Sequence, residues 1–509
     1  MGSRRDHRLS AVCVLAFVVA AGEPLLFRGH FAGDAVVHLA FAESAAHGRF
    51  FEFNPAERVS GETSPGYMLL GALFFRSTPA VWVPVALKVA GLAGWYALCW
   101  LVYRVAVRLL REPERAAERA WPALAALVAA ALPGSVYNAN VGMENGLFAA
   151  LIWWWILLAD RWRWFESVDG NARRELTLAA MLGVSCWVRP EGWLVLLVAF
   201  GFRLVTLRPP LGRWLLGLGG AAGLGAACVA FQLAFTGDVI PTSVLSRRVL
   251  AMPNTYALGG VVVDPTLAKR LMAYFPLTAL FAWGWRSGRR AVSATERFLR
   301  TMLLAFLVAY TLGGSPQLGR YLIFLMPALA IGATRGARDA WRSTGRTAKG
   351  AVLLAALAML GIDVVEAHYR MLSSSERDLR AAMQAPALRR ESTDRFLRDL
   401  GDPTWRPVIV AFEAIQARYE LDPRILVRSL DGRADRALLG FVRGGVVDHL
   451  GYLRARHVEY LANTPTYNRD RSAWSLASLG DLPPGDSVER DGVRLTRLEG
   501  EDIYRVSSR

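Results

Sequence analysis

The chain has 509 residues, 53% of them hydrophobic, and a formal net charge of +16. Soluble globular proteins do not normally contain repeated long apolar runs. With their flanking residues, the runs in this chain approach the roughly 20 residues that a membrane-spanning helix needs. The composition therefore excludes an ordinary soluble protein and predicts a polytopic membrane protein. The runs include Leu176–Val188, Trp193–Leu207, Trp214–Phe235, Leu271–Trp285, Phe298–Leu312, Tyr321–Ile331 and Ala351–Val365.

The positive charge is mostly arginine, and it gathers in short segments between the apolar runs. These segments occupy alternate loops, as the positive-inside rule predicts for cytoplasmic loops. The distribution of the positive charge therefore mainly indicates how the chain crosses the membrane. It predicts that the partner of these basic segments is the lipid bilayer and not a nucleic acid. The clusters lie at residues 4–8, 104–119, 161–174, 203–213, 286–300 and 335–349.

The first apolar segment follows MGSRRDHR, an order typical of a cleaved signal peptide or of an uncleaved first span. The uncleaved span fits better, because apolar residues resume at Pro24–Phe27. With a cytoplasmic N-terminus, the loop over residues 28–65 lies outside. A short apolar helix is expected at Tyr67–Phe75, before a second span at about 80–107. The outer loop holds five acids, Asp34, Glu43, Glu52, Glu57 and Glu62.

Eleven spans place every dense arginine cluster inside, which predicts an α-helical transmembrane domain over residues 1–367 of a plasma (inner) membrane protein. Lys88, within the second span, is expected to snorkel toward the headgroups. The three tryptophans at 153–155 are expected to anchor the membrane interface. Outer turns are predicted at Pro133–Asn145, Trp187–Trp193, Thr236–Arg270 and Gly313–Arg320.

Residues 368–509 have the composition of a soluble domain, which the topology places on the periplasmic or extracellular side. Period-two alternation and turn residues indicate short strands, and two segments have a helical pattern. We expect an α/β or α+β domain. The strands are predicted at Pro407–Phe412, Ile425–Ser429, His457–Leu461, Val488–Leu498 with a turn at Asp491-Gly492, and Ile503–Val506, and the helices at Asp394–Leu400 and Ala434–Val442.

Polar residues at the ends of different spans are predicted to face the same outer compartment. Such an arrangement favours one site at the outer membrane surface. The alternative, for each residue alone, is an ordinary solvated loop residue. The residues are Asp34, Glu144, Arg189, Glu191, Asp238, Arg247, Arg248, Gln317 and Arg320.

The acidic loop, GDAVVHLAFAESAAHGRFFEFNPAERVSGETSPGYMLL, resembles the first outer loop of the GT-C glycosyltransferases, which use polyprenyl-phosphate sugars. More narrowly it resembles the branch of the mycobacterial terminal arabinofuranosyltransferases. Matching positions are Asp34, Ala35, Gly48, Asn54, Pro55, Glu57, Arg58, Val59, Thr63, Ser64 and Pro65. Further segments match in the same order, namely Gly142-Met143-Glu144, Arg189-Pro190-Glu191-Gly192, Gly237-Asp238 to Pro241-Thr242-Ser243, and Arg320-Tyr321 to Pro327.

The resemblance implies a GT-C-like membrane glycosyltransferase of the inverting type. It would be a hexosyl- or pentosyltransferase that moves a monosaccharide from a polyprenyl-phosphate donor to a cell-envelope glycan or glycolipid. Asp34 would be the base, because transfer requires removal of the acceptor hydroxyl's proton. Arg247, Arg248 and Arg320 would bind the donor phosphate, which suits the planar guanidinium fork. The substrate cavity would include Glu57, Arg58, Glu144, Arg189, Glu191 and Asp238.

Several alternatives stay open at the level of sequence. The related branch often has two adjacent acids at the start of the loop, whereas Gly33 precedes Asp34 here, so a divalent metal is left undecided. Glu43, Glu144 or His38 are the residues that would complete such a site. Glu57-Arg58 and Arg189 with Glu191 also suit structural ion pairs, and Glu144 suits a helix cap. A transporter or flippase of lipid-linked sugars is the alternative function, although no internal repeat of the kind common in transporters is found.

Overall fold

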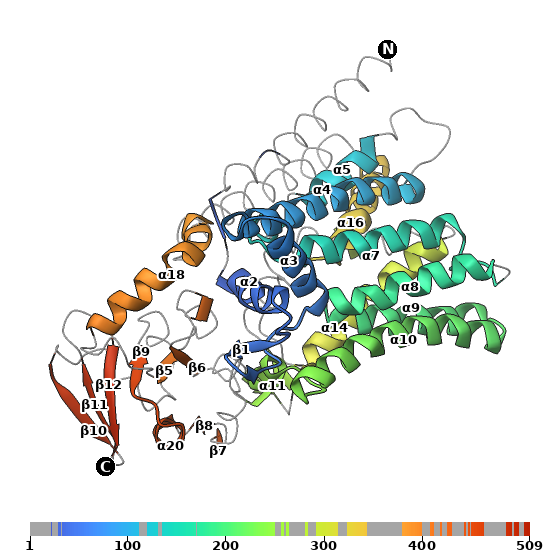
Figure 1. Cartoon of the computed structure of the whole chain (residues 1–509). Helices are drawn as coiled ribbons and strands as arrows, with labels where there is room; N and C mark the ends of the chain where they lie inside the picture. The colour runs from blue at the N-terminus through green and yellow to red at the C-terminus, as the bar shows by residue number, and fades with distance from the viewer. Residues whose placement is uncertain are drawn as a thin grey trace. The chain divides into compact units, whose positions relative to one another are not determined.

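The structure is a computed structural model of the chain, and Figure 1 shows its helices and strands. Nearly all of the predicted first span, most of the apolar run Leu271–Trp285, the run Ala351–Val365, and Gln317 and Arg320 lie outside the residues that it describes. Those residues are 22, 29–31, 33–110, 120–130, 135–168, 171–249, 256–258, 261–263, 280–282, 292–313, 323–343, 379–399, 408–411, 418–419, 425–429, 442–443, 446–447, 449–462, 485–490, 493–497 and 503–508.

The chain divides into two compact units. The bundle unit comprises Met1–Ala32, Leu87–Cys228 and Asn254–Arg377. The sheet unit comprises Gly33–Ala86, Val229–Pro253 and Asp378–Arg509, so it combines the acidic loop with the C-terminal residues.

The bundle unit consists of apolar helices packed in sequence. Helix α7 packs on α8, α8 on α9, and α9 on α14, while α16 contacts both α14 and α5 (Figure 1). The described helices are α4 (Val83–Leu110), α5 (Ala120–Ala130), α6 (Ser135–Asn140), α7 (Asn145–Arg161), α8 (Ala172–Val188), α9 (Glu191–Leu207), α10 (Leu211–Thr236), α14 (Ala294–Gly313) and α16 (Met326–Ser343), and a hairpin is formed by β3 (Tyr256–Leu258) and β4 (Val261–Val263). The first residues of α4 (83–86) and the last residues of α10 (229–236) belong to the sheet unit. Asn171 caps α8 by accepting a hydrogen bond from the Arg173 backbone N–H at 2.8 Å.

Two stretches among the described residues, Ala80–Leu110 and Leu211–Thr236, are long and apolar enough to cross a membrane, and Ala120–Ala130 is a shorter apolar helix. Many leucines of α10 point outward, including Leu211, which is 65% exposed. Exposed apolar side chains of this kind suit a lipid surrounding. The predicted number of eleven spans stays a prediction.

Aromatic rings form much of the bundle core. Trp155 and Phe165 pack with Phe298, whose ring stacks on that of Phe165 with centroids 4.5 Å apart. Trp153 and Trp155 are fully buried, whereas Trp154 is 53% exposed. The expectation of interface anchors is therefore wrong for Trp153 and Trp155. The helical period turns these two rings toward neighbouring helices and only the middle one outward.

The sheet unit begins with the acidic loop and its helices. Helix α2 (Gly33–Ala46) packs on α3 (Pro65–Ser77), which contains the expected Tyr67–Phe75 helix. Strands β1 (Glu52–Asn54) and β2 (Glu57–Arg58) pair between them, with a 3-10 turn, η1 (Ala80–Trp82), and α11 (Thr242–Val249) in the same unit.

The C-terminal part is a mixed six-stranded sheet in the order β10-β11-β12-β9-β5-β6 (Figure 1). Strand β5 runs parallel to β6 and β9, while β9, β12, β11 and β10 are joined antiparallel. The strands are β5 (Val408–Ala411), β6 (Leu426–Ser429), β9 (Tyr460–Ala462), β10 (Ser487–Arg490), β11 (Val493–Arg497) and β12 (Ile503–Ser508), with α20 (His449–Ala455) and the pair β7 (Val442–Arg443) and β8 (Val446–Val447). Each expected strand has a counterpart in the sheet.

Helix α18 (Leu379–Asp399) is much longer than the predicted Asp394–Leu400 helix, and it packs on η1. The other predicted helix, Ala434–Val442, lies outside the described residues except for Val442, which belongs to β7.

Candidate functional site

Asp34 occupies the first turn of α2 and is partly exposed. A carboxylate is favoured there because the N-terminal end of a helix carries partial positive charge. His38 lies four residues later, on the same helix face. The face that bears the predicted base therefore continues into a buried polar cluster.

That cluster joins His38 to the end of the acidic loop. The His38 Nδ1 and Glu62 Oε2 atoms are 2.8 Å apart, and both side chains are buried. The Ser64 backbone N–H donates to Glu62 Oε1 at 2.6 Å, and the Tyr67 ring meets the His38 ring edge-on with centroids 4.9 Å apart. Buried polar groups of this kind are stable only when paired, so the cluster fixes the loop against α2 near Asp34.

The middle of the acidic loop is held by strand β6. The Asn54 side chain donates to the Val427 carbonyl at 2.8 Å and accepts from the Val427 N–H at 3.0 Å. Arg428 binds Glu57 through two nitrogens, at 2.5 and 2.7 Å, and Asn54 donates to Glu57 at 2.9 Å. Glu57 thus holds the turn through Arg428, whereas Arg58 lies over the Phe235 ring at 5.4 Å. The Glu57–Arg58 ion pair, which was the structural alternative for these two residues, does not form.

Burial raises the pKa of Glu57, but the hydrogen bonds from Arg428 and Asn54 outweigh burial and leave this pKa below its ordinary value of 4.5. A lowered folded-state pKa stabilises the protein above the unfolded value, and the stabilisation disappears as the pH falls through the folded value. We expect Glu57→Gln to melt at a lower temperature than the wild type near pH 7, and the gap to narrow as the pH falls below the ordinary value of 4.5. Thermal unfolding as a function of pH measures this effect.

A matched control for this prediction is Glu489→Gln, because Glu489 pairs with Arg494 on the exposed β10–β11 hairpin. Exposed pairs contribute little. A gap that persists unchanged in acid would mean that Glu57 acts by its shape and not by its charge.

A third set of contacts ties the loop to the start of α11. The Ser60 hydroxyl donates to Asp238 at 2.7 Å and also meets the Thr242 hydroxyl at 2.7 Å. The Thr242 N–H in turn approaches both the Ser60 hydroxyl and the Ser60 carbonyl at 3.0 Å. Asp238 is buried, and its role is to join the turn after α10 to the acidic loop. Arg247 and Arg248 follow in the same short helix.

A polar pocket of about 440 Å³ lies beside α2 and α18 in the sheet unit. Glu43 on its wall binds Arg389 through two oxygens, at 3.0 and 2.7 Å. Arg49 pairs with Glu52 at 3.4 Å, and the Arg389 guanidinium lies over the Tyr419 ring. The pocket thus has aromatic and charged walls.

Glu144, Arg189 and Glu191 meet in the bundle unit, where α7, α8 and α9 have their ends. Arg189 donates to Glu144 at 2.7 Å, to both oxygens of Glu191 at 3.1 Å, and to Asn145. Their side chains are only 6%, 4% and 11% exposed for Arg189, Glu144 and Glu191. The Arg189–Glu191 pair is confirmed. Glu144 holds the N-cap position of α7 but makes no side-chain cap bond, because its carboxylate turns to Arg189.

Lys88 is a residue whose role the sequence did not reveal. It is 4% exposed, and its ammonium donates to the Asn140 carbonyl at 2.8 Å and to the His30 carbonyl. The expectation that it snorkels is therefore wrong. Lys88 instead links the backbone at His30 to the turn between α6 and α7.

The predicted site residues thus fall into two sets. Asp34, Glu57, Arg58 and Asp238 belong to the sheet unit together with α11, and Glu144, Arg189 and Glu191 belong to the bundle unit. The side chains of Arg247 and Arg248, and all of Arg320, lie outside what is described. Within the described residues no three His, Cys, Asp or Glu side chains gather as metal ligands do. The suggested metal ligands Glu43, His38 and Glu144 each bind a different partner.

Comparison with known sequences finds no matching family model and no matching curated protein. Solved structures are similar at low identity. An oligosaccharyltransferase of Archaeoglobus fulgidus, tethered with an acceptor peptide, is 13% identical, with a TM-score of 0.58 over 93% of this chain and 71% of that one. AglB of the same organism, in complex with an inhibitory peptide and a dolichol-phosphate, is 12% identical, with a TM-score of 0.55 over 88% and 69%.

ArnT from Cupriavidus metallidurans, bound to undecaprenyl phosphate, is 13% identical, with a TM-score of 0.54 over 99% of this chain and 98% of that one. These likenesses extend along nearly the whole chain and include its C-terminal part. The arabinofuranosyltransferase branch stays a prediction. The chain shares the fold of these oligosaccharyltransferase and ArnT structures.

Proposed function

We propose that the protein is an inverting glycosyltransferase at the outer face of the plasma membrane. It moves a monosaccharide from a polyprenyl-phosphate donor to a cell-envelope glycan or glycolipid. Support comes from the fold and from the solved structures that share it, one bound to undecaprenyl phosphate and one in complex with a dolichol-phosphate. The N-terminus lies in the cytoplasm, and the C-terminal domain lies outside, as the arginine distribution predicts.

The strongest support for the proposal is the connection between the acidic loop and helix α11. The loop that begins with Asp34 and the helix that carries Arg247 and Arg248 belong to one compact unit, joined by the bonds of Ser60 with Asp238 and Thr242. Glycosyl transfer needs a base for the acceptor and cations for the leaving phosphate. The sheet unit supplies both kinds of residue on connected segments.

The proposed reaction is a single displacement. The acceptor hydroxyl oxygen attacks the anomeric carbon while its proton passes to the Asp34 carboxylate. The bond from the anomeric carbon to the phosphate oxygen breaks, and its electron pair stays on the phosphate. Arg247, Arg248 and Arg320 stabilise the charge that develops there.

Other predicted site residues position these groups. Glu57 holds the loop through Arg428, and Arg58 covers Phe235 beside it. Asp238 accepts a hydrogen bond from Ser60, which holds the segment before α11 against the acidic loop. Glu144, Arg189 and Glu191 form a buried ion cluster at the ends of three helices of the bundle unit, which fixes those ends relative to one another.

The test uses the purified full chain in lipid vesicles with a panel of polyprenyl-phosphate hexoses and pentoses and of envelope glycans. Release of the polyprenyl phosphate and labelling of the acceptor are measured together. Equimolar release and labelling with one donor supports the enzyme and identifies its sugar. Transbilayer movement of labelled lipid without any release would establish the flippase alternative.

Ser60 offers a test of the connection between the acidic loop and α11. Ser60→Ala removes the hydroxyl that donates to Asp238 and meets the Thr242 hydroxyl, while the Thr242 N–H keeps the Ser60 carbonyl, so we expect a loss of about 1 kcal/mol of stability. We expect kcat/KM for the donor to fall about tenfold, because α11 loses its fixed position. Steady-state kinetics with the donor varied measures this.

The control is Ser77→Ala, because the exposed Ser77 hydroxyl bonds only to the backbone of its own helix α3. It should leave kcat/KM unchanged. Equal effects of the two variants would show that the connection does not influence donor use.

A further inference from the structure

Helix α2 carries Asp34, the proposed base, in its first turn and Glu43 near its other end. The two residues are nine positions apart, which is about 14 Å along an α-helix and about two and a half turns around it. Asp34 and Glu43 therefore lie on opposite sides of α2. A contact that holds Glu43 in place sets the direction of the helix, and with it the place of Asp34.

Arg389 of α18 makes such a contact. Its two terminal guanidinium nitrogens donate to the two carboxylate oxygens of Glu43, at 3.0 and 2.7 Å. The side chains are 17% exposed for Arg389 and 22% exposed for Glu43. A two-point contact between planar groups fixes their relative orientation, which a single contact does not do.

The Arg389 guanidinium is itself held on other sides. Its Nε donates to the Tyr419 carbonyl at 2.9 Å, and its plane lies over the Tyr419 ring, 5.2 Å from the centroid. The Tyr419 hydroxyl donates to the Ala382 carbonyl of the same helix α18 at 3.3 Å. The guanidinium is thus fixed by two segments of the C-terminal part of the chain, so it gives α2 a rigid point of attachment.

A second polar contact holds α2 from a different direction. His38 meets Glu62, and Glu43 follows His38 by five residues, which is about 140° around the helix axis. Between them Leu39 and Ala42 pack in the apolar core, and apolar packing has no preferred direction. Packing therefore keeps α2 in place, while the two polar contacts fix its rotation and tilt.

A small change in direction is enough to affect catalysis. A tilt of about 5° around the Glu43 end would move the first turn of α2 by about 1 Å. A misplacement of about 1 Å can lower the rate of an enzymatic reaction by about 100-fold. Loss of the Arg389–Glu43 pair should therefore slow transfer even in a protein that stays folded.

We propose that Arg389 is a positioning residue, which acts on Asp34 through Glu43 and helix α2. This inference rests on the proposed function, because it takes Asp34 as the base. The C-terminal part of the chain then contributes to catalysis without touching the substrate. The pair borders the polar pocket beside α2 and α18, where water reaches it, so its loss leaves no deeply buried charge and should change the folding stability little.

The test compares Arg389→Lys with the wild type in the full chain in lipid vesicles. Lysine keeps the positive charge, but its single ammonium cannot make the two-point contact. The kcat for transfer should fall about 10- to 100-fold, while the dissociation constant of the donor stays within about twofold of the wild type. Glu43→Gln should give a similar loss, and the double variant should add little to it, because both substitutions remove the same contact.

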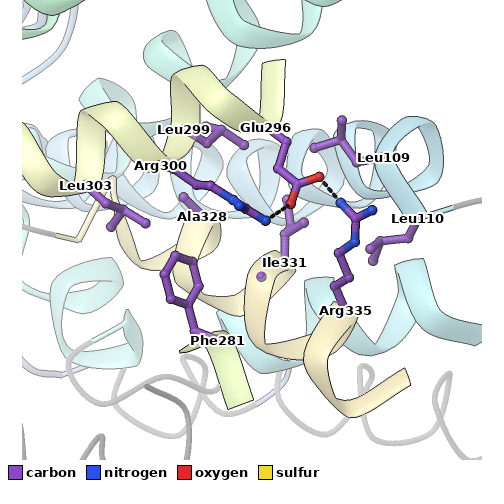
Figure 2. Close-up of a pocket in the computed structure, with 11 residues that line it drawn as sticks. Leu109, Leu110, Phe281, Glu296, Leu299, Arg300, Leu303, Ala328, Ile331 and Arg335 are labelled. Carbon is purple, nitrogen blue, oxygen red and sulfur yellow. Dashed lines mark hydrogen bonds and ion pairs between the residues drawn. The ribbon is translucent and has the colours of Figure 1, made fainter. Parts of the chain in front are cut away.

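Two controls accompany Arg389→Lys. Arg390→Lys changes the next residue of α18, which is exposed, and should leave kcat unchanged. Arg335→Lys disturbs a partly buried ion pair in the bundle unit, where Arg335 of α16 donates to Glu296 of α14 (Figure 2). It too should leave kcat unchanged. An equal loss of kcat in Arg335→Lys and Arg389→Lys would overturn the proposal, because a general loss of rigidity would explain both.

Hydrogen exchange of the α2 amides, measured by mass spectrometry on residues 33–46, tests the same contact without turnover. Exchange should be about fivefold faster in Arg389→Lys than in the wild type, and unchanged in Arg390→Lys. A wild type that turns over no donor would refute the proposed function and leave this measurement valid. Unchanged exchange, or an unchanged kcat in an active enzyme, would overturn the inference. A parallel fall of kcat, donor affinity and melting temperature would overturn it too, because Arg389 would then be purely structural.

Discussion

Replacing Asp34 by asparagine should lower kcat for glycosyl transfer about 10³-fold, within the range that a general base contributes. Asparagine has the shape of aspartate but cannot take the acceptor's proton. The first turn of α2 should persist, because asparagine is also favoured near helix starts. Donor binding should stay within about twofold of the wild type, since the phosphate contacts are assigned to other residues. Single-turnover release of polyprenyl phosphate, combined with equilibrium donor binding, separates the two effects.

Glu489→Gln is the control for Asp34→Asn, because it removes a carboxylate from the exposed hairpin of the same unit. Its kcat should equal that of the wild type. A kcat for Asp34→Asn within tenfold of the wild type would assign the base to another residue. Glu62, which lies in the same buried cluster as His38, would then be the next carboxylate to test.

Replacing Arg189 by leucine should destabilise the folded protein by about 3–5 kcal/mol, the usual result of breaking a buried ion pair from one side. The substitution leaves the carboxylates of Glu144 and Glu191 buried without their cation. Denaturant unfolding in detergent micelles, followed by tryptophan fluorescence, measures the loss. Adding Glu144→Gln and Glu191→Gln to Arg189→Leu should recover a large part of it, because the buried charges are then gone.

Arg173→Leu is the matched control for Arg189→Leu, because Arg173 lies exposed in the first turn of α8. Exposed substitutions of this kind change stability by less than about 0.5 kcal/mol. If Arg189→Leu and Arg173→Leu unfold alike, the cluster does not stabilise the bundle. A combined variant that is less stable than Arg189→Leu alone would contradict the charge-based explanation.

Sequence patterns predicted the local elements well wherever side-chain alternation carries the information. The predicted turn at Asp491-Gly492 falls between β10 and β11, whose residues Arg490 and Val493 pair directly. Helix α18 was predicted only in its last part, because Pro386 lies inside it and proline ordinarily ends a helix. The proline is accommodated here within a helix that packs on η1.

The partners of the site residues were less predictable, because they come from distant segments. Sequence neighbours suggested an ion pair between Glu57 and Arg58, but successive residues of a strand point to opposite faces. In β2 this alternation sends Glu57 to Arg428 and Arg58 to Phe235. Lys88 was misjudged for a similar reason, since the carbonyls that bind it belong to His30 and Asn140. Arg189 with Glu191 was predictable because the two are nearly adjacent.

The bond between Asn54 and Val427 joins residues 373 positions apart, and this separation has a consequence for biosynthesis. At about 5–20 residues per second, a ribosome needs roughly 20–75 seconds to make the intervening chain. During that time the turn at Asn54 has neither its Val427 partner nor the Arg428 that holds Glu57. The acidic loop of the nascent protein therefore lacks these contacts until strand β6 has been translated. A ribosome that stalls earlier releases a product whose acidic loop lacks both contacts.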